Sequence, residues 1–239
     1  MQSDEQRVVI VTGAARGIGR GHALEFARHG YAVVVNDLGA EVDGSGGSTG
    51  PAGEVVDEIR GLGGQAIANG DDVSDFAAAE RLVRSTIDHF GRLDVLVNNA
   101  GILRDRMLVN MSEQEWDAVI QVHLKGTFAP LRHAAAYWRE EHKAGRPVDA
   151  RVINTTSSSG IYGNAGQSNY GAAKAGIAAM TVITAMELGH DYLVLTDHSP
   201  RLKVARGLSA ERLARQLDVV DAVNDHLGGS FTLLKGIEV

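Results

Sequence analysis

One stretch decides the fold of this chain: VVIVTGAARGIG, residues 8–19. Its first four residues are apolar and β-branched, which predicts a buried strand. After the strand, Gly13 permits a tight turn, Gly17 permits close approach of the backbone to a pyrophosphate, and Gly19 permits close packing of a helix on the strand. The helix N-terminus offers free N–H groups and a positive dipole end to the phosphates. A glycine-rich turn without a ligand is the alternative, but its position between a strand and a helix favours a phosphate site.

The rest of the chain alternates short apolar runs with longer stretches of helical period. Such alternation predicts parallel strands joined by right-handed helical crossovers, with helices on both faces of the sheet. We therefore predict an α/β fold, a Rossmann-like doubly wound parallel sheet flanked by helices, in a single domain over residues 1–239. The expected strands are 8–11, 32–35, 66–68, 93–97, 151–154, 193–195 and 231–239, and the expected helices are 17–29, 54–61, 76–90, 112–143 with Pro130 as a candidate kink, 168–188 and 210–227.

The composition is that of a globular protein, with 44% of the 239 residues apolar and 22% charged. The net charge of −7 provides no basic surface for nucleic acid. The chain has no cysteine, which excludes disulfides and thiolate chemistry. No apolar run reaches the roughly 20 residues that span a bilayer, and residues 1–7 are polar, unlike a signal peptide. We expect a cytoplasmic protein that binds a small-molecule substrate, without nucleic-acid or membrane partners.

A carboxylate follows the second expected strand at Asp37. In a Rossmann-like fold it would accept hydrogen bonds from both adenosine-ribose hydroxyls and repel a 2′-phosphate, which favours NAD over NADP. A solvated turn residue is the alternative. After the third strand, Asp72 and Val73 are weaker candidates for contact with the adenine. The glycine- and serine-rich segment 39–53 is either a mobile surface loop or a cover over the adenosine end of the cofactor.

Tyr170 and Lys174 are four residues apart in an expected helix, so they share one face. A nearby ammonium stabilises a phenolate, so we expect the pKa of Tyr170 to fall below its usual value of about 10. The tyrosine could then act as a general acid and base near neutral pH. Ser157 could hold a carbonyl or alkoxide oxygen, and Lys174 could also hold the nicotinamide ribose. Alone, a tyrosine–lysine pair would be an ordinary surface pair; with Ser157 and the glycine turn it predicts a catalytic site.

Four motifs together resemble the short-chain dehydrogenase/reductase family. They are Thr-Gly-x-x-x-Gly-x-Gly at 12–19, Asn-Asn-Ala-Gly at 98–101, Tyr-x-x-x-Lys at 170–174, and the serine thirteen residues before the tyrosine. The resemblance implies NAD as the cofactor and catalytic roles for Ser157, Tyr170 and Lys174. The residues that it implies for cofactor binding are Gly13, Arg16, Gly17, Ile18, Gly19, Asp37, Asp72, Val73, Asn99, Ala100, Gly101, Tyr170 and Lys174.

His123 departs from the family pattern. The family commonly has an asparagine in a segment like Asn-Leu-x-Gly, and here the segment is His-Leu-Lys-Gly at 123–126. The family's asparagine is thought to hold a water molecule in a proton relay. A histidine could do the same, because it can donate and accept hydrogen bonds, which makes His123 a further catalytic candidate. It could equally be a packed helix residue.

Four further segments, 35–39, 101–106, 122–124 and 160–164, resemble the (3R)-hydroxyacyl-CoA dehydrogenase part of the peroxisomal multifunctional enzyme. This resemblance implies oxidation of a secondary alcohol to a ketone by NAD, or the reverse. The implied substrate is a 3-hydroxyacyl-CoA or a steroid-like compound. The family also implies a homodimer or a tetramer.

From residue 190 onward the family pattern stops. Residues 190–239 resemble a fragment of the polymerase-and-histidinol-phosphatase (PHP) domain of family X DNA polymerases, a metal-dependent phosphoesterase whose ligands would match His198 and Glu238. Two ligands are too few for a catalytic metal site, so we expect no bound metal. We expect a strand-helix-strand unit, with Ser209 as the N-cap of its helix, that completes the sheet.

This change of pattern indicates a recombined chain, and it favours an engineered one over the alternatives, a natural fusion or a truncated gene model. Residues 1–189 carry the cofactor site and the catalytic residues. The residues that would lie near the nicotinamide and the substrate come from the foreign part, and they are Asp197, His198, Ser199 and Arg201. The alternative to an active dehydrogenase is therefore a chimeric scaffold with the same fold and little or no activity.

Overall fold

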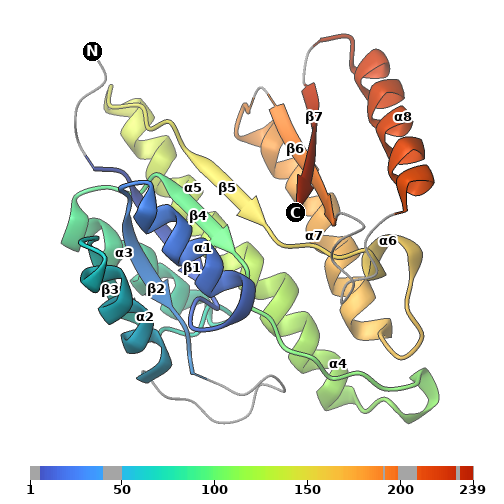
Figure 1. The fold of residues 1–239 in the computed structure, drawn as a ribbon, viewed down its shortest axis with the longest axis horizontal. Coiled ribbons are helices and arrows are strands. Elements are labelled where there is room, and N and C mark those ends of the chain that lie inside the picture. The colour runs from blue at the N-terminus through green and yellow to red at the C-terminus, as the bar shows by residue number, and fades with distance from the viewer. Residues whose placement is uncertain (1–5, 40–49, 191, 199–208, 230–231, 239) are drawn as a thin grey trace. The chain divides into compact units, whose positions relative to one another are not determined.

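The computed structural model of the protein describes residues 6–39, 50–190, 192–198, 209–229 and 232–238 (Figure 1). They group into two compact units, one within residues 1–179 and one within residues 180–239, and each is described by itself. Ser199, Arg201 and residues 40–49 of the glycine-rich segment lie outside the described residues. No helix in the described ranges is long and apolar enough to cross a membrane.

A parallel sheet with the strand order β3-β2-β1-β4-β5 forms the centre of the first unit. The order reverses at β1, and the carboxyl ends of β1 and β4 therefore mark the point at which doubly wound sheets bind ligands. This topology confirms the predicted Rossmann-like fold class. The elements are β1 (Val8–Thr12), α1 (Gly17–Arg28), β2 (Ala32–Asn36), α2 (Gly50–Gly61), β3 (Ala66–Asn69), α3 (Phe76–Phe90), β4 (Val95–Asn98), η1 (Leu108–Asn110), α4 (Glu113–Val119), η2 (Ile120–Lys125), α5 (Gly126–Lys143), β5 (Arg151–Asn154) and α6 (Ser159–Tyr162), followed by α7 (Ser168–Glu187), which continues past residue 179.

Helices cover both faces of this sheet (Figure 1). Successive side chains of a strand point to opposite faces. On one face, Val9 belongs to a cluster with Ile59 of α2, and on the other, Ile10 belongs to a cluster with Leu82 of α3 and Trp138 of α5. All residues of β1 and β2 are buried, which explains why these strands are unbroken apolar runs in the sequence.

The helix expected over 112–143 is present but interrupted. It starts with a capping box between Ser112 and Glu115 at the head of α4. A π-helical stretch, η2, then separates α4 from α5, and Pro130 lies inside α5, after the irregular turns. π-helical turns inside long helices are frequent at functional sites, and η2 contains His123.

The second unit contains β6 (Tyr192–His198), α8 (Ala210–Leu227) and β7 (Thr232–Glu238), and α8 begins directly after Ser209, as predicted. In this unit β6 and β7 pair with each other as a parallel two-stranded sheet. That the strand-helix-strand unit completes the main sheet stays a prediction.

Candidate active site

The candidate residues of the first unit lie at the carboxyl ends of its strands. Gly13 follows β1, Asp37 follows β2, Asn99 follows β4, and Ser157 follows β5. The carboxyl ends of parallel strands share one edge of the sheet, so these four positions, distant in sequence, border the same region.

The turn after β1 is packed so closely that two of its glycines have no room for a side chain. A Cβ at Gly19 would lie 2.1 Å from the Gly13 carbonyl oxygen, and a Cβ at Gly13 would lie 2.8 Å from Ala100 Cα. Gly17 differs, because a Cβ there would meet no described atom within 4 Å. Its φ of +52° is nevertheless one that favours glycine. The lack of a side chain at Gly13 and Gly19 therefore permits the close packing of the turn, whereas at Gly17 it leaves open space beside the turn.

Thr12 and Asn99 join this turn to the turn after β4. Thr12 Oγ1 accepts hydrogen bonds from the N–H groups of Asn99 at 3.0 Å and of Ala100 at 3.1 Å. In return, Asn99 Nδ2 donates to the carbonyl oxygens of Thr12 at 3.0 Å and of Gly13 at 3.2 Å. Asn99 thus binds the protein's own backbone and fixes the shape of the glycine turn.

The N-terminus of α1 is suited to an anion. Within the described structure no side chain caps it after Arg16, and Ile18 in its first turn is 51% exposed. The first N–H groups of a helix need acceptors from outside the helix, and a phosphate supplies them. An uncapped helix start beside the open position at Gly17 therefore fits the pyrophosphate of a dinucleotide.

Asp37 is fastened to the same turn. Its Oδ2 accepts a hydrogen bond from the Ala15 N–H at 3.0 Å, and its Oδ1 accepts one from the Gly39 N–H at 2.7 Å. The carboxylate is therefore held in place at the end of β2, unlike a turn residue that moves freely in solvent. Each oxygen can accept a second hydrogen bond, which recognition of ribose hydroxyls requires.

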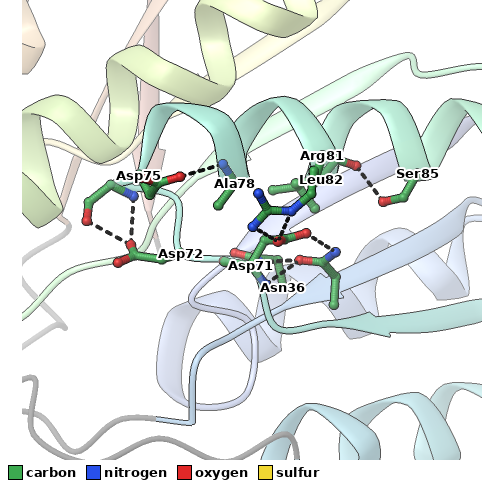
Figure 2. Close-up of polar contacts among 10 residues, drawn as sticks. Asn36, Asp71, Asp72, Asp75, Ala78, Arg81, Leu82 and Ser85 are labelled. Atoms are coloured by element: carbon green, nitrogen blue, oxygen red, sulfur yellow. Dashed lines mark hydrogen bonds and ion pairs between the residues drawn. The ribbon is translucent and has the colours of Figure 1, made fainter.

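A polar cluster follows β3 (Figure 2). Asn36 Nδ2 donates to the Asn69 side-chain oxygen at 2.8 Å and to the Asp71 carbonyl oxygen at 2.9 Å. Arg81 of α3 forms an ion pair with the Asp71 carboxylate at 2.8 Å. Asp72 is not part of that ion pair, because its Oδ1 accepts from the N–H and the hydroxyl of Ser74.

The two adenine candidates are thus partly engaged by the protein. Asp72 uses one carboxylate oxygen in the turn that leads into α3. Val73 is 5% exposed, and its side chain belongs to the core cluster of α3 and α5. Only the backbone of Val73 is therefore suited to a ligand.

Ser157, Tyr170 and Lys174 are brought together from two segments. Ser157 lies in the turn between β5 and α6, and the other two lie one turn apart on α7. The Ser157 hydroxyl acts on Tyr170 and lowers the pKa of its phenol. Lys174 Nζ lies 5.5 Å from the centroid of the Tyr170 ring. This arrangement can hold an oxygen atom and exchange a proton with it.

Lys174 is buried, with 3% of its surface exposed. Its Nζ donates a hydrogen bond to the Thr155 carbonyl oxygen at 2.6 Å. Burial disfavours the ammonium form and lowers the pKa of Lys174 to about 8. The lysine is therefore still mainly cationic at neutral pH but loses its charge in mildly alkaline solution.

The expected fall in the pKa of Tyr170 is wrong. Burial raises the pKa of Tyr170 above its ordinary value of 10, the hydrogen bond with Ser157 lowers it, and the charge of Asp105 raises it again. The Lys174 ammonium does not reverse this result, because the pKa of Lys174 is about 8 and the lysine has lost its charge at the pH at which Tyr170 ionises. Tyr170 is therefore protonated at neutral pH in this structure.

His123 is buried and packs against Tyr170. Its ring meets the Tyr170 ring edge-on, with the centroids 5.1 Å apart. Its Nε2 lies 2.8 Å from the Ile102 carbonyl oxygen and 3.1 Å from the Ile102 nitrogen, and the tautomer decides which bond forms. Its Nδ1 is buried and has no hydrogen-bond partner among the described residues.

The His123 ring is neutral. Burial and then the charge of Lys174 lower its pKa to about 4, although the backbone of Ile102 acts in the opposite direction. His123 is thus both a packed helix residue and a neighbour of Tyr170, so the structure leaves both interpretations of the sequence open.

Three further residues of the site were not predicted from the sequence: Asp105, Gln167 and Asn169. Asn169 is fully buried, and its Nδ2 donates to the carbonyl oxygens of Arg104 at 3.0 Å and of Glu115 at 3.1 Å. These bonds fasten the start of α7 to the segment after β4. Their positions were the only signals in the sequence: Gln167 and Asn169 lie shortly before Tyr170, and Asp105 lies within segment 101–106.

The residues of 190–239 that were predicted to lie near the nicotinamide and the substrate stay predictions. His198 and Glu238 are partners in the β6–β7 register, but their side chains and that of Asp197 lie outside what the structure describes. Among the described residues no group of three or more histidines and carboxylates is placed to hold a metal ion.

Comparisons with known proteins show the family of the chain. A profile of the short chain dehydrogenase family matches residues 7–194. The chain is 47% identical over 205 residues to hydroxyacyl-CoA dehydrogenase ChsB1 of Mycobacterium tuberculosis, which covers 83% of this chain and 62% of that protein. It is 48% identical over 181 residues to the peroxisomal multifunctional enzyme type 2 of Mus musculus, covering 76% of this chain and 23% of that protein. The chain thus spans less than two thirds of the length of these relatives.

A solved structure shows the same fold. The crystal structure of a short chain dehydrogenase from Mycobacterium avium has a TM-score of 0.73 and 56% sequence identity. The similarity covers 80% of this chain and 68% of that one.

Proposed function

The chain belongs to the short-chain dehydrogenase family, and from this premise we propose that it moves a hydride between NAD and a secondary alcohol or ketone. The observation that carries the proposal is the group of Ser157, Tyr170 and Lys174, which lies at the same sheet edge as the uncapped start of α1. A group that holds and protonates an oxygen atom, next to a site suited to a dinucleotide, is what this reaction requires.

In this reaction the side chains of the protein bind the substrate oxygen atom and transfer one proton to or from it. NAD, when bound, supplies the hydride acceptor. Ser157 donates a hydrogen bond to the substrate oxygen, and Tyr170 takes the hydroxyl proton when the alcohol is oxidised or gives its proton when the ketone is reduced. Since Tyr170 is protonated at neutral pH in this structure, it has the form that ketone reduction requires. Oxidation requires the phenolate, so we expect it to be favoured by alkaline pH.

His123 has a supporting role in this proposal. Its ring packs against the Tyr170 ring and restricts the orientation of the tyrosine. Its unpartnered Nδ1 is the atom that would hold a water molecule in a relay, because a buried polar atom without a partner is unfavourable. A neutral ring, which the low pKa of His123 ensures, keeps one nitrogen as an acceptor.

Asp37 is the reason for preferring NAD to NADP. A fixed carboxylate at this place favours ribose hydroxyls and repels a 2′-phosphate. Titration calorimetry with each nucleotide tests the preference. We expect wild-type protein to bind NAD at least about tenfold more tightly than NADP, an effect of about 1.4 kcal/mol, and Asp37→Asn to narrow the ratio. Equal affinities in the wild type would contradict the preference.

The same titration separates the main proposal from its alternative. A flat titration with NAD, on protein shown to be folded by circular dichroism, would favour a chimeric scaffold with little or no activity. Residues 190–239 are the basis of that alternative, and the family profile ends at residue 194. Their origin in a PHP-type domain stays a prediction.

The substrate is proposed from the relatives. ChsB1 is named as a hydroxyacyl-CoA dehydrogenase, so we propose a 3-hydroxyacyl-CoA, with a steroid-like compound as the second choice. A homodimer or a tetramer is part of the same proposal, and light scattering coupled to gel filtration tests it. A monomer at micromolar concentration would contradict the assembly without affecting the chemistry.

A further inference from the structure

A chain of hydrogen bonds links Asp105, which lies outside the catalytic group, to Ser157. Asp105 Oδ2 accepts from Gln167 Nε2 at 2.8 Å, and Gln167 Oε1 accepts from the Ser159 hydroxyl at 2.8 Å. The Ser159 N–H then donates to Ser157 Oγ at 3.2 Å. We infer that Asp105 is a positioning residue, which acts through Gln167 and Ser159 to fix the orientation of the Ser157 hydroxyl. The inference rests on the proposed function, since it concerns the same site.

The direction of these bonds follows from the chemistry of a carboxylate. An ionised carboxylate only accepts hydrogen bonds, so Asp105 selects the orientation in which the Gln167 amide presents its nitrogen to it. The amide oxygen then faces Ser159, and it also accepts from Asn164 Nδ2 at 3.1 Å. At the end of the chain, the Ser159 N–H occupies one lone pair of Ser157 Oγ. The Ser157 proton is thereby left to interact with Tyr170, whose pKa the Ser157 hydroxyl lowers.

The backbone around this chain is fastened on two sides. The Arg106 N–H donates to the Gly166 carbonyl oxygen at 2.8 Å, within an isolated bridge between Arg106 and Gln167. On the other side, α6 lies directly on α7, because a Cβ at Gly160 would be 2.6 Å from the Ala175 nitrogen. The segments that carry the chain of hydrogen bonds are therefore preorganised, as a positioning role requires.

Asp105 also acts on Tyr170 through its charge. After the larger effect of burial, the Asp105 carboxylate raises the pKa of Tyr170. In the part of the chain that the structure describes, the other ionisable groups in contact with Tyr170 are Lys174, on the same helix, and His123, on η2. His123 is neutral above a pH of about 4. Asp105 and Ser157 thus affect the pKa of Tyr170 in opposite directions, which makes the two effects separable.

Two variants separate the charge from the hydrogen bonds. Asp105→Asn removes the charge but keeps an oxygen that can accept from Gln167. Gln167→Leu keeps the charge but breaks the chain, and Ser159→Ala is a second variant of that kind should Gln167→Leu fail to fold. Asp88→Asn, at an exposed position of α3, is the matched control for the change in net charge.

The decisive readout is the titration of Tyr170 in cofactor-free protein, followed by NMR with ¹³C at the tyrosine Cζ and assigned with Tyr170→Phe. We expect a lower pKa of Tyr170 in Asp105→Asn, because a negative charge is lost. We expect a higher pKa in Gln167→Leu, because the released Ser157 hydroxyl no longer stabilises the phenolate. Asp88→Asn should match the wild type. A merely structural role of the network would not move the pKa of Tyr170 in opposite directions.

Turnover gives the second readout. With NAD and a 3-hydroxyacyl-CoA, we expect kcat to fall by roughly tenfold in Gln167→Leu, the effect of one lost hydrogen bond in the transition state, with a smaller change in KM. An unchanged pKa of Tyr170 in Gln167→Leu, or a shift in the same direction as in Asp105→Asn, overturns the inference. Absence of turnover in wild-type protein counts against the proposed function alone, because the titration needs neither substrate nor cofactor.

Discussion

Replacing Gly19 with alanine tests the packing of the glycine turn. The added Cβ would lie 2.1 Å from the Gly13 carbonyl oxygen and 2.5 Å from Asn99 Nδ2. Both contacts are far shorter than van der Waals distance, and the first is with backbone, so either the turn or α1 must move. Movement of the turn breaks the two hydrogen bonds that Asn99 Nδ2 donates to the backbone.

The magnitude follows from these two effects. Overpacking of a close-packed site destabilises by about 1–3 kcal/mol, and each lost hydrogen bond adds about 1 kcal/mol. We therefore expect Gly19→Ala to lower the free energy of unfolding by about 3–5 kcal/mol. Gly21→Ala is the matched control, because Gly21 lies in the same helix and a Cβ there would meet no described atom within 4 Å. It should raise stability by about 0.5–1 kcal/mol, the difference in helix propensity between glycine and alanine.

Urea unfolding of both variants, followed by circular dichroism and by tryptophan fluorescence, measures the difference. Trp138 is a suitable probe because it is 8% exposed and lies in the core of the first unit. Equal stability of Gly19→Ala and Gly21→Ala would refute the argument, since it would mean that the turn and α1 are not in close contact.

Three further predictions concern the same site. Gly17→Ala should keep the free energy of unfolding within about 1–2 kcal/mol of that of the wild type. It should nevertheless abolish NAD binding in calorimetry, because the added Cβ would enter the open space beside the turn. Unchanged NAD affinity would contradict the phosphate site. The pKa of His123 falls from 6.5 to about 4 on folding, so between these pH values the unfolded chain binds more protons than the folded one. As the pH falls from 6.5 to 4, the free energy of unfolding of the wild type should therefore decrease by about 3 kcal/mol relative to that of His123→Gln. A constant difference in urea unfolding over that range would contradict the buried neutral ring. Below a pH of about 8 the buried ammonium of Lys174 disfavours the folded state. At pH 7, Lys174→Met should therefore raise the free energy of unfolding by about 1–2 kcal/mol, a value from which the lost hydrogen bond to Thr155 is already subtracted. The same variant should lose turnover. Lower stability in thermal unfolding would show that the lysine stabilises the fold.

The sheet and the principal site residues could be predicted from the sequence because they depend on local patterns. The buried strand before Gly13, and the tyrosine and lysine four residues apart, each specify a local geometry. Parallel topology then places the strand ends along one edge. The candidate group of Ser157, Tyr170 and Lys174 could therefore be predicted from short segments of the chain.

The electrostatics of the site could not be predicted in the same way. The pKa of Tyr170 depends on how deeply α7 is packed and on Asp105, which is 65 residues away in sequence. The sequence pattern indicated Lys174 as the main influence, but burial lowers the pKa of Lys174 to about 8, so the lysine is neutral at the pH at which Tyr170 ionises. Pairing of β6 with β7 is likewise a non-local choice between partners, and apolar runs alone do not determine it.

The central claim is that Tyr170 exchanges a proton with a substrate whose hydride goes to NAD. The most direct test is the formation of NADH, followed at 340 nm, from NAD and a 3-hydroxyacyl-CoA, with wild-type protein and with Tyr170→Phe. We expect steady NADH formation in the wild type and a rate about 10²–10⁴-fold lower in the variant, the usual contribution of a general acid–base. An equal rate in Tyr170→Phe, or no NADH from folded wild-type protein that binds NAD, would contradict the account.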